Sequence, residues 1–271
     1  MPELPEVETT RRGIGPYLRG QRITRLTVRE SRLRWPVDPH LPRLAEGQQV
    51  KGVRRRGKYL LIDLEAGCIV VHLGMSGSLR LGSGNEAPKQ HDHVEITLES
   101  GRVLRYHDPR RFGSFHYTGD DPLGHPLLAR LGVEPLSEDF NGALLKQAAG
   151  RRRSAVKMLI MDAHVVVGVG NIYASESLFL AGIHPARAAG RIALARYDAL
   201  ADAIRSVLGR AIAEGGTTLR DFVNGVGEPG YFAQSLAVYG RAGEPCRCCG
   251  GTIRSRVLGQ RSTFFCSHCQ H

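Results

Sequence analysis

The sequence contains no long apolar run, and this absence narrows the classes of protein to which the chain can belong. Nowhere in its 271 residues is there a stretch of about 18 consecutive apolar residues, so a membrane-spanning helix is not expected. Residues 1–20 also lack the apolar core of a secretory signal peptide. We therefore expect a cytoplasmic protein with no membrane partner.

Lysine is scarce in a chain that is strongly basic. Only five lysines stand among 37 basic residues, and the formal net charge is +11. Arginine therefore supplies nearly all of the positive charge, and its planar guanidinium group suits phosphate oxygens. An excess of this size indicates a polyanionic partner, most simply nucleic acid.

Cysteine is scarce outside the end of the chain, where five of the six cysteines fall within the last 26 residues. In a cytoplasmic protein such clustering favours a metal site over disulfides. Cys246 and Cys249 form one Cys-x-x-Cys pair, Cys266 and Cys269 form a second, and sixteen residues separate the pairs. Four thiolates at this spacing predict a closed, structural zinc site. Cys248 is an alternative ligand to Cys249.

The length of the chain predicts two domains, each with its own core. The hydrophobic periodicity also changes along the chain. Residues 3–18 predict a helix, and β signals with glycine-containing turns dominate from there to about residue 117, which favours a sandwich or barrel. From about residue 123 the pattern becomes helical. The turn-rich residues 126–136 near the start of this region are the predicted linker. The expected strands are 23–28, 58–64, 68–73, 94–98 and 102–106. One later helix is expected at 171–180, and a second is expected from the apolar stripe Leu200, Ile204, Leu208 and Ile212. A hairpin of strands 253–257 and 260–265 is expected between the cysteine pairs.

The start of the chain carries a possible nucleophile. If Met1 is removed, the chain begins with Pro2, whose secondary amine can attack an electrophilic carbon and form an iminium. An α-amino group titrates at about 8, so much of it is neutral near physiological pH. Glu3 and Glu6 lie beside it, one helical turn apart. Taken alone, the same residues are also typical of a simple helix start.

Several stretches together resemble the bacterial formamidopyrimidine-DNA glycosylases, in the same order and over essentially the whole chain. They are residues 2–8, 72–77, 108–113 and 167–174 and the two cysteine pairs. The resemblance implies an α+β multidomain fold with an N-terminal β-sandwich and leading helix, a helix–two-turn–helix domain and a C-terminal zinc finger. The corresponding ranges are 1–125, 126–136 for the linker, 137–230 and 237–271.

The resemblance also implies an activity. Members of this family excise oxidised purines, notably 8-oxoguanine and formamidopyrimidines, from duplex DNA and then cleave the abasic strand by β,δ-elimination. The expected partner is therefore double-stranded DNA with an oxidised purine or an abasic site. The expected cofactor is one structural zinc ion per chain, and the expected oligomeric state is a monomer.

Residue roles follow from the same resemblance. Pro2 is the expected nucleophile and Glu3 the acid/base residue, Lys58 and Arg261 complete the catalytic set, and Glu6 is a supporting carboxylate. The expected DNA-binding residues are His72, Met75, His93, Arg110, Arg111, Phe112, Lys157 and Asn171.

Some of these residues have a plainer alternative. Met75 and Phe112 are expected to fill the gap left by a flipped nucleotide, but core packing would equally explain two apolar side chains. Arg110 is expected to contact the base opposite the lesion, and an extended segment would turn Arg111 the other way. Lys157 is either a phosphate contact or an ordinary exposed helix lysine. Residues 217–230 match a loop that caps the flipped base, or form a plain linker.

The sequence leaves two rival functions open. One is the related pyrimidine-directed endonuclease VIII type, against which Leu4 and the set Met75, Arg110 and Phe112 favour the purine-directed type. The other is a catalytically silent DNA-binding protein, from which an active lyase differs in forming a covalent adduct with abasic DNA when reduced by borohydride.

Overall fold

The computed structural model describes residues 2–216 and 235–271 and groups them into two compact units. Of the described residues, the first unit holds 2–129 and 214–216, and the second holds 130–213 and 235–271. Among the described helices, none combines the length and the apolar character needed to cross a membrane. Residues 217–230, for which we predicted a capping loop or a plain linker, lie outside the described part of the chain, as does the end of the predicted range 137–230.

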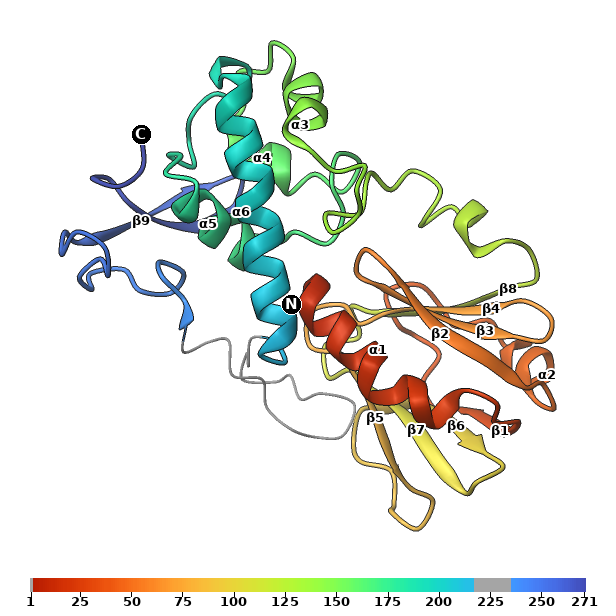
Figure 1. Cartoon of the computed structure of the whole chain (residues 1–271). Helices are drawn as coiled ribbons and strands as arrows, with labels where there is room; N and C mark the ends of the chain where they lie inside the picture. Colours follow the sequence, from red (N-terminus) through yellow and green to blue (C-terminus); the bar gives the residue numbers. More distant parts are fainter. Residues whose placement is uncertain (1, 217–234) are drawn as a thin grey trace. The chain divides into compact units, whose positions relative to one another are not determined.

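The first unit opens with helix α1 (Leu4–Leu18). Pro5 lies in its first turn, where a missing N–H group costs nothing, and Glu6 lies near the positive end of the helix dipole. Val7, Ile14 and Leu18 are fully buried on one face. This face packs against strand β2, so the helix is held beside the sheet that carries several candidate residues (Figure 1).

Two four-stranded antiparallel sheets form the body of the first unit, with strand orders β1-β6-β7-β5 and β2-β3-β4-β8 (Figure 1). Their facing side chains share one apolar core with α1, as expected for a β-sandwich. The elements are β1 (Ile23–Val28), α2 (Leu41–Ala45), β2 (Val50–Arg56), β3 (Tyr59–Leu64), β4 (Cys68–His72), β5 (Ser78–Ser83), β6 (Asp92–Leu98), β7 (Arg102–His107), β8 (Ser114–Thr118) and the 3₁₀ turn η1 (Pro122–Gly124).

A tight turn fixes one edge of the second sheet. β2 and β3 pair up to Arg56 and Tyr59, which leaves a two-residue turn of Gly57 and Lys58. Gly57 has φ +57°, a conformation that glycine adopts at little cost. Tyr59 also pairs with His72 at the end of β4, so Lys58 and His72 emerge at the same end of the sheet.

The second unit is helical. The long helix α6 completely buries three members of the predicted stripe, Leu200, Ile204 and Leu208, and leaves the fourth, Ile212, half-buried. α6 packs against α3 and α5, and two turns between α4 and α5 complete the helix–two-turn–helix arrangement. The bounds are α3 (Gly142–Ala149), α4 (Val156–Ile160), α5 (Asn171–Leu180), the 3₁₀ turn η2 (Ala189–Arg191) and α6 (Leu194–Ala213).

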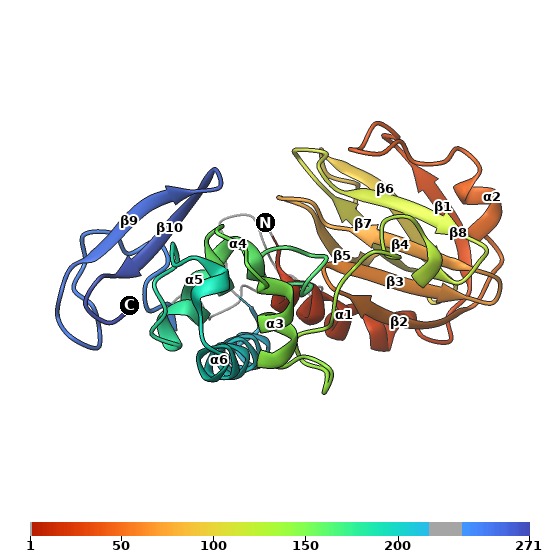
Figure 2. The ribbon, with the colours of Figure 1, turned by 90° about the horizontal axis from the view of Figure 1, so that it is seen from above.

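The chain ends in a hairpin of β9 (Ile253–Leu258) and β10 (Arg261–Cys266), which matches the predicted strands to within one residue. Gly259 and Gln260 form its turn with φ of +52° and +60°, the combination that suits a two-residue hairpin. Figure 2 shows the hairpin beside α5, which contacts β10.

A buried carboxylate anchors the segment that enters this C-terminal region. Glu176 on α5 is buried, and its carboxylate accepts hydrogen bonds from three consecutive backbone N–H groups. The donors are Ala237 at 2.8 Å, Val238 at 2.9 Å and Tyr239 at 2.8 Å. Hydrogen bonds to a charged acceptor are among the stronger ones in proteins, so the entry to the hairpin has one fixed position on α5.

Candidate active site and nucleic-acid interface

The N-terminal residues form a buried carboxylate pair beside Pro2. Pro2, Glu3 and Glu6 are all buried. Glu3 has an extended backbone and precedes α1, and its N–H group donates to Glu6 Oε2 at 2.7 Å. Because that N–H belongs to the peptide group that joins Pro2 to Glu3, the Glu6 carboxylate fixes the orientation of Pro2. The arrangement places a carboxylate for proton transfer next to the residue expected to supply the amine.

Lys58 and His72 form a second cluster, at the end of the sheet β2-β3-β4-β8. Burial, together with the nearby positive charges of Lys58 and Arg34, lowers the pKa of His72 to about 4. The Gly74 N–H group donates to His72 Nδ1 at 3.0 Å. The imidazole is therefore neutral at physiological pH and carries its proton on Nε2, which leaves that nitrogen as a hydrogen-bond donor.

Met75, Arg110 and Phe112 lie at the surface on two neighbouring loops. The side chains of Met75 and Phe112 are 38% and 42% exposed, so core packing does not explain them. The Arg110 guanidinium group lies over the Phe112 ring at 4.7 Å, a favourable contact of a cation with an aromatic face. Exposed apolar side chains next to an arginine suit insertion into a base stack.

Arg111 does not lie in an extended segment, which was the condition for its side chain to point away from that of Arg110. Its φ is +54°, in the left-handed region, because a turn closes here when the Arg111 N–H donates to the Asp108 carbonyl at 3.1 Å. The Arg111 guanidinium group pairs instead with Glu30 at 3.4 Å. Its direction is therefore set by a turn and an ion pair, not by strand alternation.

His93 was predicted as a DNA contact from the resemblance, and the structure buries it. Its Nε2 atom lies 2.8 Å from the Asp108 carbonyl oxygen, so in this conformation the ring supports the turn that carries Arg110. Its Nε2 atom is thus engaged within the protein, and the DNA contact of His93 stays a prediction.

Lys157 is fully buried, so it is not an ordinary exposed helix lysine, and the predicted phosphate contact stays a prediction. The side chain is 0% exposed, and its Nζ atom donates to Asn171 Oδ1 at 2.6 Å and Thr263 Oγ1 at 2.8 Å. Asn171 in turn donates from Nδ2 to the Ser262 carbonyl at 3.0 Å. Burying an ammonium group is costly unless it is hydrogen-bonded. Lys157 therefore joins the start of α5 to β10.

Arg261 begins β10 directly after the hairpin turn, and its side chain is exposed. Ser262 and Thr263, which follow it, are the residues that Lys157 and Asn171 hold. The structure thus brings two of the predicted residues of the second unit, Lys157 and Asn171, into one connected group, with the exposed Arg261 side chain beside it.

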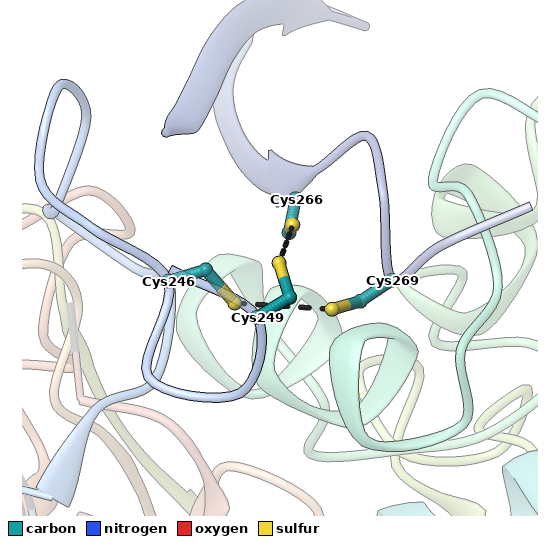
Figure 3. Close-up of side chains that lie close together, drawn as sticks. All are labelled: Cys246, Cys249, Cys266 and Cys269. Carbon is teal, nitrogen blue, oxygen red and sulfur yellow. Dashed lines mark hydrogen bonds between the residues drawn. The ribbon is translucent and has the colours of Figure 1, made fainter. Parts of the chain in front are cut away.

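The four paired cysteines form a compact thiol cluster, shown in Figure 3. All four sulfur atoms lie within 4.8 Å of one another, with Cys246 and Cys269 3.9 Å apart and Cys249 and Cys266 3.5 Å apart. A tetrahedral zinc ion with Zn–S bonds of about 2.3 Å separates its sulfur ligands by roughly 3.8 Å. The cluster therefore fits a structural zinc ion. Cys248 is exposed and is not part of this cluster.

Two buried carboxylates with structural roles escaped the sequence analysis. Asp108 was noticed only as part of a motif, yet it is fully buried and its carboxylate accepts three hydrogen bonds. Glu176 was not singled out at all. Its signal in the sequence is an acidic residue at the buried face of a helix, four positions after Ile172, where an unpaired charge would be costly.

Models of protein families match three parts of the chain. The formamidopyrimidine-DNA glycosylase N-terminal domain matches residues 1–115, the H2TH domain of the same glycosylase matches residues 131–223, and a zinc finger found in FPG and IleRS matches residues 243–271. The last match contains the four-thiolate cluster, so the chain has one structural zinc site.

Whole-chain relatives and solved structures agree with these matches. The formamidopyrimidine-DNA glycosylases of Methylococcus capsulatus and Alkalilimnicola ehrlichii are each 58% identical to this chain, with 100% of both chains covered. The crystal structure of the Thermus thermophilus MutM (FPG) protein has a TM-score of 0.90 at 41% identity and covers 99% of this chain and 98% of its own.

Two further structures contain DNA. A Lactococcus lactis FPG mutant in complex with a Fapy-dG-containing DNA gives a TM-score of 0.93 at 32% identity, and MutM in complex with a DNA containing carbocyclic 8-oxo-G gives 0.92 at 33%. Both cover 100% of this chain and 100% of their own. The chain has a sandwich with a leading helix, a helix–two-turn–helix unit and a four-cysteine finger, and its sequence matches its relatives over its whole length. This chain therefore belongs to the formamidopyrimidine-DNA glycosylase family.

Proposed function

We infer that Pro2, Glu3 and Glu6 form the chemical centre of this family's reaction in the present chain. The reaction removes oxidised purines from duplex DNA through a Schiff base and then cleaves the abasic strand by β,δ-elimination. The observation that carries the assignment is the 2.7 Å hydrogen bond from the Glu3 N–H group to the buried Glu6 carboxylate. It orients the residue expected to attack and leaves the Glu3 side chain beside it.

The chemistry assigns one step to each group. After removal of Met1, the Pro2 nitrogen forms a bond to C1′ of the sugar while the glycosidic bond breaks and the base leaves, and the amine releases its proton. The C1′–O4′ bond then breaks, O4′ takes up a proton, and the nitrogen lone pair forms the C=N bond of the iminium. The resulting iminium makes the adjacent sugar protons acidic, so the two flanking phosphates can be eliminated in turn. Glu3 moves protons at the sugar, which is the role of a positioned carboxylate in general acid–base catalysis. Glu6 keeps the Pro2–Glu3 peptide group in place.

Phosphate contacts come from both units. In the first, the ammonium group of Lys58 and the Nε2–H of the neutral His72 are the proposed donors to phosphate oxygens near the lesion. In the second, Arg261 and the N-terminal end of α5 at Asn171 are the proposed donors. Lys157 acts through Asn171 and Thr263, which it holds in place.

Arg110 stacked on Phe112 is the proposed reader of the base opposite the lesion, and Met75 and Phe112 fill the gap in the stack. The proposed partner is duplex DNA with an oxidised purine or an abasic site, bound by a monomer. Because that substrate is chromosomal DNA, the proposed location in a bacterial cell is the cytoplasm.

A borohydride trap tests the chemical assignment. The purified chain is incubated with abasic-site DNA and reduced, which converts an iminium into a stable amine. We expect a covalent protein–DNA adduct whose intact mass corresponds to a chain without Met1 and whose attachment maps to Pro2. A chain that binds this DNA but gives no adduct is a silent binding protein.

Arg261→Ala is expected to weaken DNA binding and to reduce the slope of log affinity against log salt concentration by about one unit, because one phosphate contact is lost. The measurement is the dissociation constant at several salt concentrations. Arg210→Ala on α6 removes the same charge from another exposed position and should leave the slope unchanged. Equal slopes in the wild type and Arg261→Ala would mean that the hairpin does not reach the DNA backbone.

Arg110→Ala is expected to flatten the preference for the base opposite the lesion. Arginine can donate to the acceptors of cytosine, whereas adenine leaves donors unmatched at a cost of roughly 1–3 kcal/mol per wrong base. Single-turnover excision rates opposite cytosine and opposite adenine give the preference as their ratio.

Arg111→Ala is the matched control, because the Arg111 side chain is paired with Glu30. It should retain the ratio even if overall affinity falls. An unchanged ratio in Arg110→Ala would show that another residue reads the opposite base.

A further inference from the structure

The carboxylate of Asp108 lies between the loop that carries Met75 and the loop that carries Arg110 and Phe112. We call these three exposed side chains the wedge residues. The Asp108 side chain is 0% exposed and follows β7 directly. Its Oδ1 atom accepts from Ser76 Oγ at 2.8 Å, and its Oδ2 atom accepts from Tyr106 Oη at 3.0 Å and from the Gly113 N–H group at 2.9 Å. One buried side chain thus joins three separate backbone segments.

Two of these contacts are immediate neighbours of wedge residues. Ser76 follows Met75, and Gly113 follows Phe112. The loops also touch through their backbones, because a Cβ atom on Gly74, where φ is +67°, would lie 2.4 Å from the Gly113 nitrogen. Asp108 therefore fixes the separation of the two loops at the point where Met75 and Phe112 leave the surface.

The main chain of Asp108 is held as firmly as its side chain. Its N–H group donates to the His91 carbonyl at 3.0 Å, and its own carbonyl accepts from the Arg111 N–H group at 3.1 Å. His93 Nε2 lies 2.8 Å from the same carbonyl. Hydrogen bonds to the carbonyl and carboxylate of Asp108 thus hold the turn that presents Arg110, the first from Arg111 and the second from Gly113.

Tyr106 keeps its proton under all ordinary conditions. Burial raises the pKa of Tyr106 far above its usual value, and the Asp108 carboxylate raises it further. The phenol is therefore a permanent donor. The carboxylate has no apolar substitute here, because removing it would leave the buried Gly113 N–H group and the Ser76 hydroxyl without an acceptor. Tyr106 Oη would keep only the longer hydrogen bond to the His72 carbonyl oxygen, at 3.4 Å.

We propose that Asp108 is a positioning residue that locks the Met75 loop to the Arg110–Phe112 loop, so that the three side chains enter the duplex as one group and the opposite base is read correctly. The stacking of Arg110 on Phe112 transmits the position of the ring to the guanidinium group. A shift of either loop would displace the donors of Arg110 from the base edge. This inference rests on the proposed function, since the opposite base matters only to an enzyme that flips a nucleotide out.

The experiment measures the ratio of excision rates opposite cytosine and opposite adenine in single turnovers. A defect in chemistry or folding lowers both rates by the same factor and leaves the ratio unchanged, so the ratio isolates positioning. Asp108→Ala removes all three hydrogen bonds and should bring the ratio close to one. Ser76→Ala removes a single hydrogen bond and should lower the ratio about two- to tenfold.

Two variants serve as controls. Asp108→Asn can accept from Tyr106 and Gly113 with its oxygen and donate to Ser76 with its nitrogen, so it should keep the wild-type ratio. Ser78→Ala makes the same substitution as Ser76→Ala at another buried serine two residues on, for which the described residues provide no side-chain hydrogen bond. It should also keep the wild-type ratio.

A wild-type ratio in Asp108→Ala would overturn the proposal, as would a loss in Asp108→Asn as large as that in Asp108→Ala. If Asp108→Ala does not fold, the comparison of Ser76→Ala with Ser78→Ala decides, and equal ratios in these two overturn the proposal. Failure of the proposed function itself has a different signature, because the wild type would then give no borohydride adduct.

Discussion

Glu3→Gln should bind lesion-containing duplex DNA with wild-type affinity and release the damaged base at least about 100-fold more slowly. A positioned general acid–base group contributes about 10²- to 10⁴-fold to a rate. Glutamine has the shape of glutamate but cannot carry a proton to or from the sugar. The backbone hydrogen bond from Glu3 to Glu6 does not involve the Glu3 side chain, so the orientation of Pro2 should survive.

The measurement pairs single-turnover base release with a binding titration on the same DNA. Glu8→Gln is the matched control, because Glu8 is a carboxylate on the same helix that pairs with Arg11 and Arg12 at 2.8 Å. It should release base at the wild-type rate. Base release near the wild-type rate in Glu3→Gln would refute the role assigned to Glu3.

Cys249→Ser should lose the zinc ion and most of the DNA affinity together. A structural zinc site contributes about 10–16 kcal/mol of apparent binding free energy in small domains, and that energy holds the fold of the segment around it. The hairpin that presents Arg261 ends at the ligand Cys266, so losing the metal releases the strand that carries the proposed phosphate contact.

Cys248→Ser provides the control for this variant. Cys248 precedes Cys249 but is exposed and outside the cluster, so one zinc ion per chain and full DNA affinity should remain. Zinc content per chain and the dissociation constant for DNA are measured on both variants. Chelator-treated, zinc-free protein that still binds DNA at full strength would show that the finger is not needed for binding.

The long, periodic elements were predictable from the sequence. The helix predicted at 3–18 is Leu4–Leu18, the strand predicted at 23–28 is Ile23–Val28, and the helix predicted at 171–180 is Asn171–Leu180. Local periodicity determines such elements. α2, α4 and α3 span only five to eight residues, which is too short for a periodic signal, and they are held by tertiary packing.

The candidate site was predictable as a set of motifs but not as a set of contacts. Lys157 occupies an ordinary helix position in the sequence, and its burial depends on Thr263, 106 residues away. The role of Asp108 depends on Ser76, 32 residues earlier. Arg111 misled us because a turn closed on Asp108, not strand geometry, sets its backbone. Long-range partners of this kind leave no local pattern.

The three hydrogen bonds that the Glu176 carboxylate accepts from backbone N–H groups also affect how the zinc finger binds DNA. A finger on a free tether would sample many orientations, and its arginine would reach a phosphate only after an orientational search that opposes binding. Here the tether is fixed at Ala237–Tyr239, and Lys157 holds the hairpin again at Thr263. The conformational entropy of the finger is therefore lost when the chain folds, and association with DNA begins from a preorganised surface.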